Sequence, residues 1–283
     1  MAFSFRRLEE AEELPRDSLV MLKDTISRYV WSIEGNLKLL LYKVFFFFRD
    51  GQYIGDDAVG GVITNLHLPR DWSIFEQLHS PLPGRTDSRG EDFGRVHFAI
   101  GCHPKQAALL TTLMLKRLDA LVRRPGVVAV GECGLDYSAR SFADREVQAT
   151  AFRAQIHLAL RYNLPLVLHI RGNGRAWAGE GDLAEEDCYK ILEECGVPRD
   201  FPIHRHCFNG NWISAHTWLS TYPASKIGIT ALVTFPKAIH IHEVARRVPL
   251  SRLLLETDAP YFAPCTSQAS LPSLVMIESP HAK

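Results

Sequence analysis

From about residue 58 onward, short apolar runs alternate with longer amphipathic segments. The apolar runs are almost continuous, which is typical of parallel strands that are covered on both faces. They lie at residues 62–65, 96–100, 127–130, 166–168, 202–204, 226–230 and 253–255. Seven such strands separated by helices predict an α/β fold of the TIM-type barrel kind, because right-handed crossovers place every helix outside the sheet.

Two of the intervening segments carry a clear apolar stripe at helical spacing. The first stripe comprises Leu110, Met114, Leu118 and Leu121, and the second comprises Val147, Ala151, Phe152, Ile156 and Ala159. Gly and Pro mark the joints, as in Pro125-Gly126 before one strand and Pro165 before the next. We expect both stripes to face the sheet.

The N-terminal region contains one intensely apolar run, residues 39–48. A membrane-spanning helix needs about 20 such residues. Lys43 and Arg49 cut this run short, so it indicates a buried helix or strand. We divide the chain into a divergent N-terminal segment (residues 1–57), a barrel domain (58–264) and a short tail (265–283), with residues 81–92 as a surface insertion.

Composition adds little about the partner of the protein. Hydrophobic residues make up 46% of the chain and charged residues 23%, enough for a proper core. Lys plus Arg and Asp plus Glu both number 32, so any contact with nucleic acid must be local. The six cysteines form no Cys-x-x-Cys pair, which favours reduced thiols in an intracellular, cytoplasmic or nuclear protein without membrane attachment.

Candidate chemistry gathers where the predicted strands end. Glu132, His169, His206 and Asp258 each follow a short apolar run. Barrel sites form at the carboxyl ends of strands, and mixed carboxylates and imidazoles there indicate a divalent-metal centre. For three of them a structural role is the alternative: Glu132 as a helix cap, His169 as a buried core histidine and Asp258 as a turn residue.

Other residues flank these candidates. Arg171 follows His169 by two positions, and its guanidinium suits a phosphate oxygen. His103, in Gly101-Cys102-His103-Pro104, is a second candidate phosphate contact. His204 and His206 lie two positions apart on one strand face, so either one or both could bind metal. Cys207 is expected to be a small core residue, although a thiolate ligand would favour zinc over magnesium.

Five ordered motifs carry a family resemblance. They are Gly101-Cys102-His103-Pro104, Gly131-Glu132-x-Gly134-Leu135-Asp136-Tyr137, His169-x-Arg171, His206-Cys207-Phe208-x-Gly210 and Glu256-Thr257-Asp258-Ala259-Pro260. The series resembles the TatD family of metal-dependent deoxyribonucleases from about residue 61 to 264. The form His204-Arg205-His206-Cys207-Phe208 is similar to a eukaryotic branch of that family.

The resemblance implies an amidohydrolase-like (β/α)8 barrel that cleaves phosphodiester bonds of DNA, often from a 3′ end. It implies Glu132 as a metal bridge, His169 and His206 on one ion, and Asp258 on the other and as a catalytic residue with Glu132. Arg171 and His103 would lie near the scissile phosphate. The implied cofactor is one or two divalent ions, Mg²⁺ first and Zn²⁺ or Mn²⁺ as alternatives. The implied partner is single-stranded DNA or a 3′ end. The sequence does not fix the oligomeric state, and a monomer is favoured.

The sequence departs from the family pattern at both ends. The family's first strand ends in His-x-His, whereas residues 17–24, the best candidate for that strand, offer aliphatic residues. His240-Ile241-His242 matches the His-x-His motif, but it follows the seventh strand and opens a helix, so we reject it. Asn65-Leu66-His67, on the second strand, is a weaker substitute. The closing helices after Asp258 are expected to be truncated.

Losing the imidazole pair leaves three readings open. The first is a nuclease weakened or silenced at one metal subsite. The second is a catalytically silent barrel that binds nucleic acid or a protein. The third is an amidohydrolase acting on a small cyclic amide, since the same fold hosts that chemistry.

Overall fold

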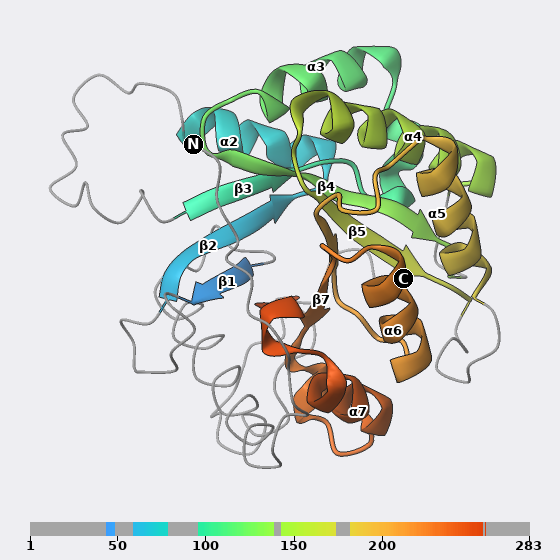
Figure 1. Ribbon diagram of the computed structural model, residues 1–283. Coiled ribbons are helices and arrows are strands. Elements are labelled where there is room, and N and C mark those ends of the chain that lie inside the picture. The colour runs from blue at the N-terminus through green and yellow to red at the C-terminus, as the bar shows by residue number, and fades with distance from the viewer. Residues whose placement is uncertain are drawn as a thin grey trace, which may run out of the picture.

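The computed structural model describes residues 44–48, 59–78, 96–138, 143–173, 182–256 and 258. Eight strands close into a barrel in chain order, and the described helices lie outside it, mostly against β3 to β7 (Figure 1). The strands are β1 (Val44–Phe48), β2 (Val59–Leu66), β3 (Val96–Ile100), β4 (Val127–Asp136), β5 (Leu166–Arg171), β6 (Ile203–Arg205), β7 (Lys226–Ile229) and β8 (Leu253–Glu256). The pairs from β2 to β8 are all parallel. All seven strands predicted from the apolar runs are therefore confirmed.

Strand β1 differs from the others in direction. It pairs antiparallel with both β2 and β8, with Val44 opposite Thr64 and Phe45 opposite Glu256. It lies inside the apolar run at residues 39–48, so the strand alternative predicted for that run is confirmed for Val44–Phe48. Residues 17–24 lie outside the described part of the chain. Because β1 is antiparallel, its carboxyl end points away from the end at which the other strands finish.

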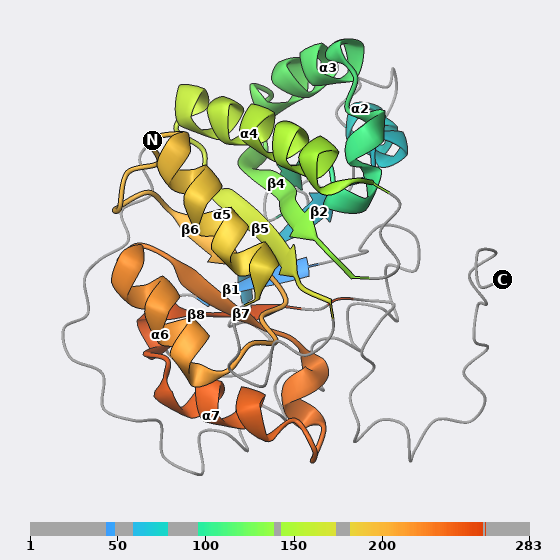
Figure 2. The same cartoon turned by 90° about the vertical axis from the view of Figure 1, so that its right-hand side faces the viewer.

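Helices cover the outside of the barrel, and Figures 1 and 2 show them in two views. They are α2 (Trp72–Leu78), α3 (Thr112–Val122), α4 (Arg145–Tyr162), α5 (Leu183–Glu194), α6 (Trp212–Thr221) and α7 (Ile239–Arg247). The hydroxyl of Thr111 caps α3 by accepting from the Met114 N–H, and the side chain of Asn211 caps α6 by accepting from the Ser214 N–H. His240-Ile241-His242 lies in α7, as expected.

Helix α4 packs on the barrel through the predicted stripe, with one correction. Phe152 and Ile156 are fully buried, and Ala151 and Ala159 are buried with them. Val147 is 39% exposed, so its predicted place in the stripe is wrong. The position beside it, Gln148, is buried instead. Its amide pairs with a peptide group of the barrel, which stabilises a polar residue where an apolar one was expected.

Gln148 and Gln155, two turns apart on α4, each clamp a backbone segment. The Gln148 Oε1 accepts from the Asp136 N–H at 2.7 Å, and its Nε2 donates to the Asp136 carbonyl at 3.0 Å. Gln155 makes the same pair of bonds with Cys102. Its Oε1 accepts from the Cys102 N–H at 2.7 Å, and its Nε2 donates to the Cys102 carbonyl at 3.1 Å. These pairs attach α4 to the loop after β3 and to the end of β4.

The predicted stripe of α3 is confirmed at its C-terminal half. Leu118 and Leu121 are buried, whereas Met114 and Leu110 are partly buried and pack against the core. Leu110 itself lies before the helix, at the end of the 3₁₀ turn Pro104–Leu109.

Several other expectations have a definite outcome. Five cysteines are free thiols, and Cys265 lies outside the described residues. The predicted insertion at residues 81–92 and the truncated closing helices after Asp258 also lie outside them. Among the helices that the structure describes, none has the length and apolar character to cross a membrane. The domain boundaries stay predictions.

Candidate metal centre

Glu132 lies at the centre of the site, inside the barrel. The strand was expected to end at Glu132, but β4 continues to Asp136 with an irregularity between Gly131 and Cys133. A Cβ on Gly131 would lie 2.6 Å from the Cβ of Val167, so only glycine fits there. The Glu132 side chain is completely buried, and it contacts side chains of other strands. The helix-cap alternative is therefore wrong.

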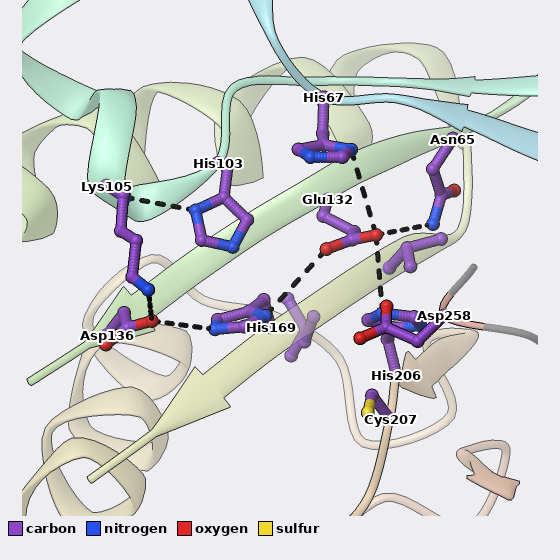
Figure 3. Close-up of polar contacts among 12 residues, drawn as sticks. Asn65, His67, His103, Lys105, Glu132, Asp136, His169, His206, Cys207 and Asp258 are labelled. Carbon is purple, nitrogen blue, oxygen red and sulfur yellow. Dashed lines mark hydrogen bonds and ion pairs between the residues drawn. The ribbon is translucent and has the colours of Figure 1, made fainter. Parts of the chain in front are cut away.

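The two oxygens of Glu132 face different neighbours (Figure 3). Oε1 accepts from Asn65 Nδ2 at 2.8 Å and lies 3.3 Å from His206 Nε2 and 3.9 Å from His67 Nδ1. Oε2 lies 3.8 Å from His169 Nδ1. One carboxylate thus stands between His169 on one side and His206 and His67 on the other, which suits a carboxylate that would bridge two cations.

His169 is oriented by its second ring nitrogen. Its Nε2 lies 3.2 Å from Asp136 Oδ2, and Lys105 Nζ lies 3.4 Å from the same oxygen. Burial acts to raise the pKa of Asp136, but the hydrogen bonds from His169 and Ser138 and the charges of His169 and Lys105 outweigh it and hold that pKa well below its usual range. An ionised Asp136 accepts the Nε2 proton, which leaves Nδ1 to face Glu132.

His206 is oriented in the same manner from the other side of the barrel. Its Nδ1 lies 2.8 Å from Glu256 Oε2, and His204 Nε2 lies 3.0 Å from that oxygen. Burial acts to raise the pKa of Glu256, but His206 and His204 prevail and lower it to about 2. Burial also lowers the pKa of His204. His206 Nε2 therefore points toward Glu132.

Asp258 completes the cluster after β8. Its Oδ1 lies 3.4 Å from His206 Nε2, and its side chain is 12% exposed, whereas Glu132 is completely buried. The alternative of a turn residue bonded only to its own backbone does not describe this contact. The four predicted ligands Glu132, His169, His206 and Asp258 are thus linked in one chain of contacts.

The arrangement suits a divalent cation. Three groups of residues each place their donor atoms within 4.8 Å of one another. The groups are His103, Glu132 and His169; His204, His206 and Glu256; and His206, Cys207 and Asp258. A fully buried carboxylate needs compensating charge, and a bound cation would supply it. Carboxylates with imidazoles form sites for Mg²⁺, Mn²⁺ or Zn²⁺, so the residues fit such an ion.

The two predicted phosphate contacts lie beside this cluster. The His103 ring centroid is 4.3 Å from that of His169 and 5.4 Å from that of His67. Its Nδ1 accepts from the Lys105 N–H at 3.1 Å. Arg171 is the last residue of β5, exposed and in register with Asp136. Both positions are at the ligand end of the barrel, and their phosphate role stays a prediction.

The expectation for Cys207 was wrong. It is half-buried rather than a core residue, in a left-handed conformation with φ 46°. It belongs to the donor group with His206 and Asp258, because its position two residues after β6 places it at the end of the barrel rather than in the wall.

Several residues of the site had no assigned role in the sequence. Asp136 and Glu256 were part of the family motifs but had no role of their own, and nothing in the sequence indicated a role for Lys105. The structure places Asp136 and Glu256 behind the two histidines. A signal was present for Asn65 and His67, two polar residues at period two where an apolar strand ends.

Comparison with known proteins gives the family. The family model described as TatD related DNase matches residues 85–277. The chain is 37% identical to the human protein named 3'-5' RNA nuclease TATDN2 over 59% of the chain and 20% of the relative. It is 34% identical to the Pantoea vagans protein named 3'-5' ssDNA/RNA exonuclease TatD over 58% of each. The chain thus spans less than two thirds of the length of these curated relatives.

Solved structures agree with the fold. The TatD homologue YJJV from Escherichia coli has a TM-score of 0.55 at 26% identity, over 72% of this chain and 70% of that one. A TatD family hydrolase from Entamoeba histolytica has a TM-score of 0.56 at 23% identity, over 77% and 68%. The family match covers more than half of the sequence, and the chain belongs to the TatD-related DNase family.

Proposed function

We propose that this protein is a metal-dependent hydrolase that cleaves phosphodiester bonds of DNA, as an exonuclease acting at 3′ ends of single strands. The observation that carries the proposal is the buried Glu132 carboxylate, whose two oxygens face separate imidazoles while Asp258 lies beside one of them. One curated relative is named a 3'-5' RNA nuclease and the other a 3'-5' ssDNA/RNA exonuclease, and these names support a nucleic-acid substrate.

In this proposal Glu132, His169, His206 and Asp258 hold the ions, with Mg²⁺ first and Mn²⁺ or Zn²⁺ as alternatives. The bound cations would lower the pKa of the attacking water and stabilise charge on the phosphate. Asp136 and Glu256 keep the two histidines in the tautomers that present a lone pair to the site.

The chain's own residues supply the remaining steps. Asp258 is the partly exposed carboxylate of the cluster, so it accepts the proton of the attacking water. Arg171, the exposed last residue of β5, donates to non-bridging oxygens of the phosphate through its guanidinium. His103, beside His169, donates to the same phosphate.

Hydrolysis of a 3′-labelled single-stranded oligonucleotide, with Mg²⁺ or Mn²⁺, tests the proposal. Glu132→Gln removes the charge at the centre of the cluster and should abolish turnover. Glu193→Gln makes the same chemical change at an exposed position of α5 and should leave the rate unchanged. Equal hydrolysis by wild type and Glu132→Gln would overturn the enzymatic role. The same assay with a 3′-blocked strand tests the end preference, since a blocked end should stop digestion.

The two other readings of the sequence are weaker. A silent binding module would have no need for two histidines each held by a buried carboxylate, because binding phosphate does not depend on which imidazole nitrogen is exposed. Turnover of a cyclic amide is supported by the fold alone, whereas the family match points to nucleic acid.

A further inference from the structure

Asn65 and His67 stand at the carboxyl end of β2, two residues apart and therefore on the same face of the strand. Both point toward one atom (Figure 3). Asn65 Nδ2 lies 2.8 Å from Glu132 Oε1, and His67 Nδ1 lies 3.9 Å from it. The same oxygen faces His206, whose Nε2 also faces Asp258.

Three of the separations among these atoms fall in the range expected for ligands around one ion. Ligands at about 2.1 Å from an octahedral ion are about 3 Å apart when adjacent and about 4.2 Å apart when opposite. The His206–Glu132, His206–Asp258 and His67–Glu132 distances are 3.3, 3.4 and 3.9 Å. All three lie inside that interval, and all three are longer than a strong charge-assisted hydrogen bond.

Asn65 provides an independent observation. Its side chain is 2% exposed, and its Oδ1 atom has no hydrogen-bond partner among the described residues. A buried carbonyl oxygen without a donor is unfavourable by about 1–3 kcal/mol. Nδ2 is the atom that now faces Glu132 Oε1, and rotation of the amide by half a turn would bring Oδ1 there in its place. An amide oxygen is a ligand that Mg²⁺ and Mn²⁺ accept.

We propose that Asn65 and His67 are ligands of the cation held against Glu132 Oε1, together with His206 and Asp258. The cation held against Oε2 would then rely on His169. This deepens the proposed function and rests on it for the presence of metal. It differs from the grouping that the family resemblance implies, because His206 moves to the ion of Asp258.

The proposal also explains where the ligands of this subsite come from. Strand β1, next to β2 in the barrel, has the sequence Val-Phe-Phe-Phe-Phe and offers no ligand atom. It is antiparallel, so its carboxyl end lies away from Glu132. The end of the neighbouring strand β2 presents Asn65 and His67 to Oε1.

Titration of the purified full chain with Mn²⁺ tests the assignment, by calorimetry and by the loss of the free-ion paramagnetic signal. The variants are His67→Ala and Asn65→Leu, where leucine keeps the volume without the amide. His216→Ala, at an exposed position on α6, is the matched control. Wild type and control should bind two ions. Each β2 variant should bind one ion at wild-type affinity and the other at least tenfold more weakly.

A converse variant guards against simple loss of folding. Asn65→Asp adds a carboxylate next to Glu132, so without metal its melting temperature should fall. Added Mn²⁺ should raise that temperature by more than it does for wild type, since the carboxylate binds the ion more strongly than the amide.

The assignment is wrong if the β2 variants bind both ions as wild type does, or if wild type binds a single ion that they do not affect. It is also wrong if Mn²⁺ stabilises Asn65→Asp no more than wild type. These outcomes are separate from failure of the nuclease proposal, which is decided by oligonucleotide hydrolysis and can fail while both ions still bind.

Discussion

The Glu256 carboxylate lies behind His206, with 2.8 Å between Oε2 and the ring Nδ1, while Nε2 on the opposite side of the ring lies 3.3 Å from Glu132. Because Glu256 is ionised and fully buried, it can only accept, so the Nδ1 proton is fixed and Nε2 carries a lone pair. The ring is thus prepared as a metal ligand before any ion arrives.

Replacement of Glu256 by Gln should weaken this preparation. The amide can donate as well as accept, so the tautomer of His206 is no longer fixed, and Mn²⁺ affinity should fall by about 10- to 100-fold. Calorimetric titration measures the effect. Glu193→Gln, the exposed control, should bind Mn²⁺ as wild type does. An unchanged affinity in Glu256→Gln would show that its contact with His206 does not orient the ring.

Replacement of Arg171 by Ala should affect substrate binding more than the metal. The exposed guanidinium at the end of β5 is expected to contact a phosphate, so KM for single-stranded DNA should rise several-fold and the salt dependence of binding should fall by about one counterion. Arg124→Ala, an exposed position before β4, should change neither quantity. Equal KM values in wild type and Arg171→Ala would remove Arg171 from the substrate path.

Replacement of Gln155 by Leu should lower stability. The change removes the Gln155 partner of both the backbone N–H and the backbone C=O of Cys102, which stay buried. Each unpaired group costs about 1–3 kcal/mol. Urea unfolding should therefore show a loss of at least about 2 kcal/mol. Thr150→Ala, exposed on the same helix, should stay within about 0.5 kcal/mol of wild type. A similarly small loss in Gln155→Leu would contradict the clamp.

The cysteines should differ sharply in reactivity. Burial raises the pKa of Cys102 to about 12, so at pH 8 only about one thiol in ten thousand is ionised. Iodoacetamide should therefore leave Cys102 unmodified in the folded protein, while the half-buried Cys207 reacts. Peptide mass analysis after labelling, with a urea-unfolded control in which both react, checks this. Equal labelling of the two in the folded state would be inconsistent with the burial of Cys102.

The strand pattern was readable from the sequence because buried parallel strands are apolar on both faces, as at residues 127–130 and 166–168. The length of β4 was not readable. Its continuation through Glu132 to Asp136 is polar and glycine-rich, and it depends on pairing with β5 rather than on hydrophobicity. The prediction for Val147 was wrong for a related reason. The next position, Gln148, is buried because its amide bonds to the backbone of Asp136, and only the folded barrel brings that backbone into contact with the helix.

The four expected ligands could be named because strand ends in a barrel meet at one rim. The residues behind them could not be assigned roles. Nothing in the spacing of Asp136 and His169, or of His206 and Glu256, indicates which nitrogen meets which carboxylate. The antiparallel direction of β1 could not be predicted either, because an apolar run does not indicate whether its strand is parallel to its neighbours.

The glycines of the barrel wall have a mechanical consequence. A Cβ on Gly101 would lie 2.7 Å from the Gly131 backbone, and one on Gly131 would meet Val167, so β4 touches its neighbours through main chain on both sides. Main-chain contacts cannot relax by rotamer changes. The spacing between the loop that carries His103 and the strand β5 that carries His169, on either side of Glu132, is therefore as stiff as the sheet itself. Random substitution should be tolerated less at these two glycines than at most ligand positions.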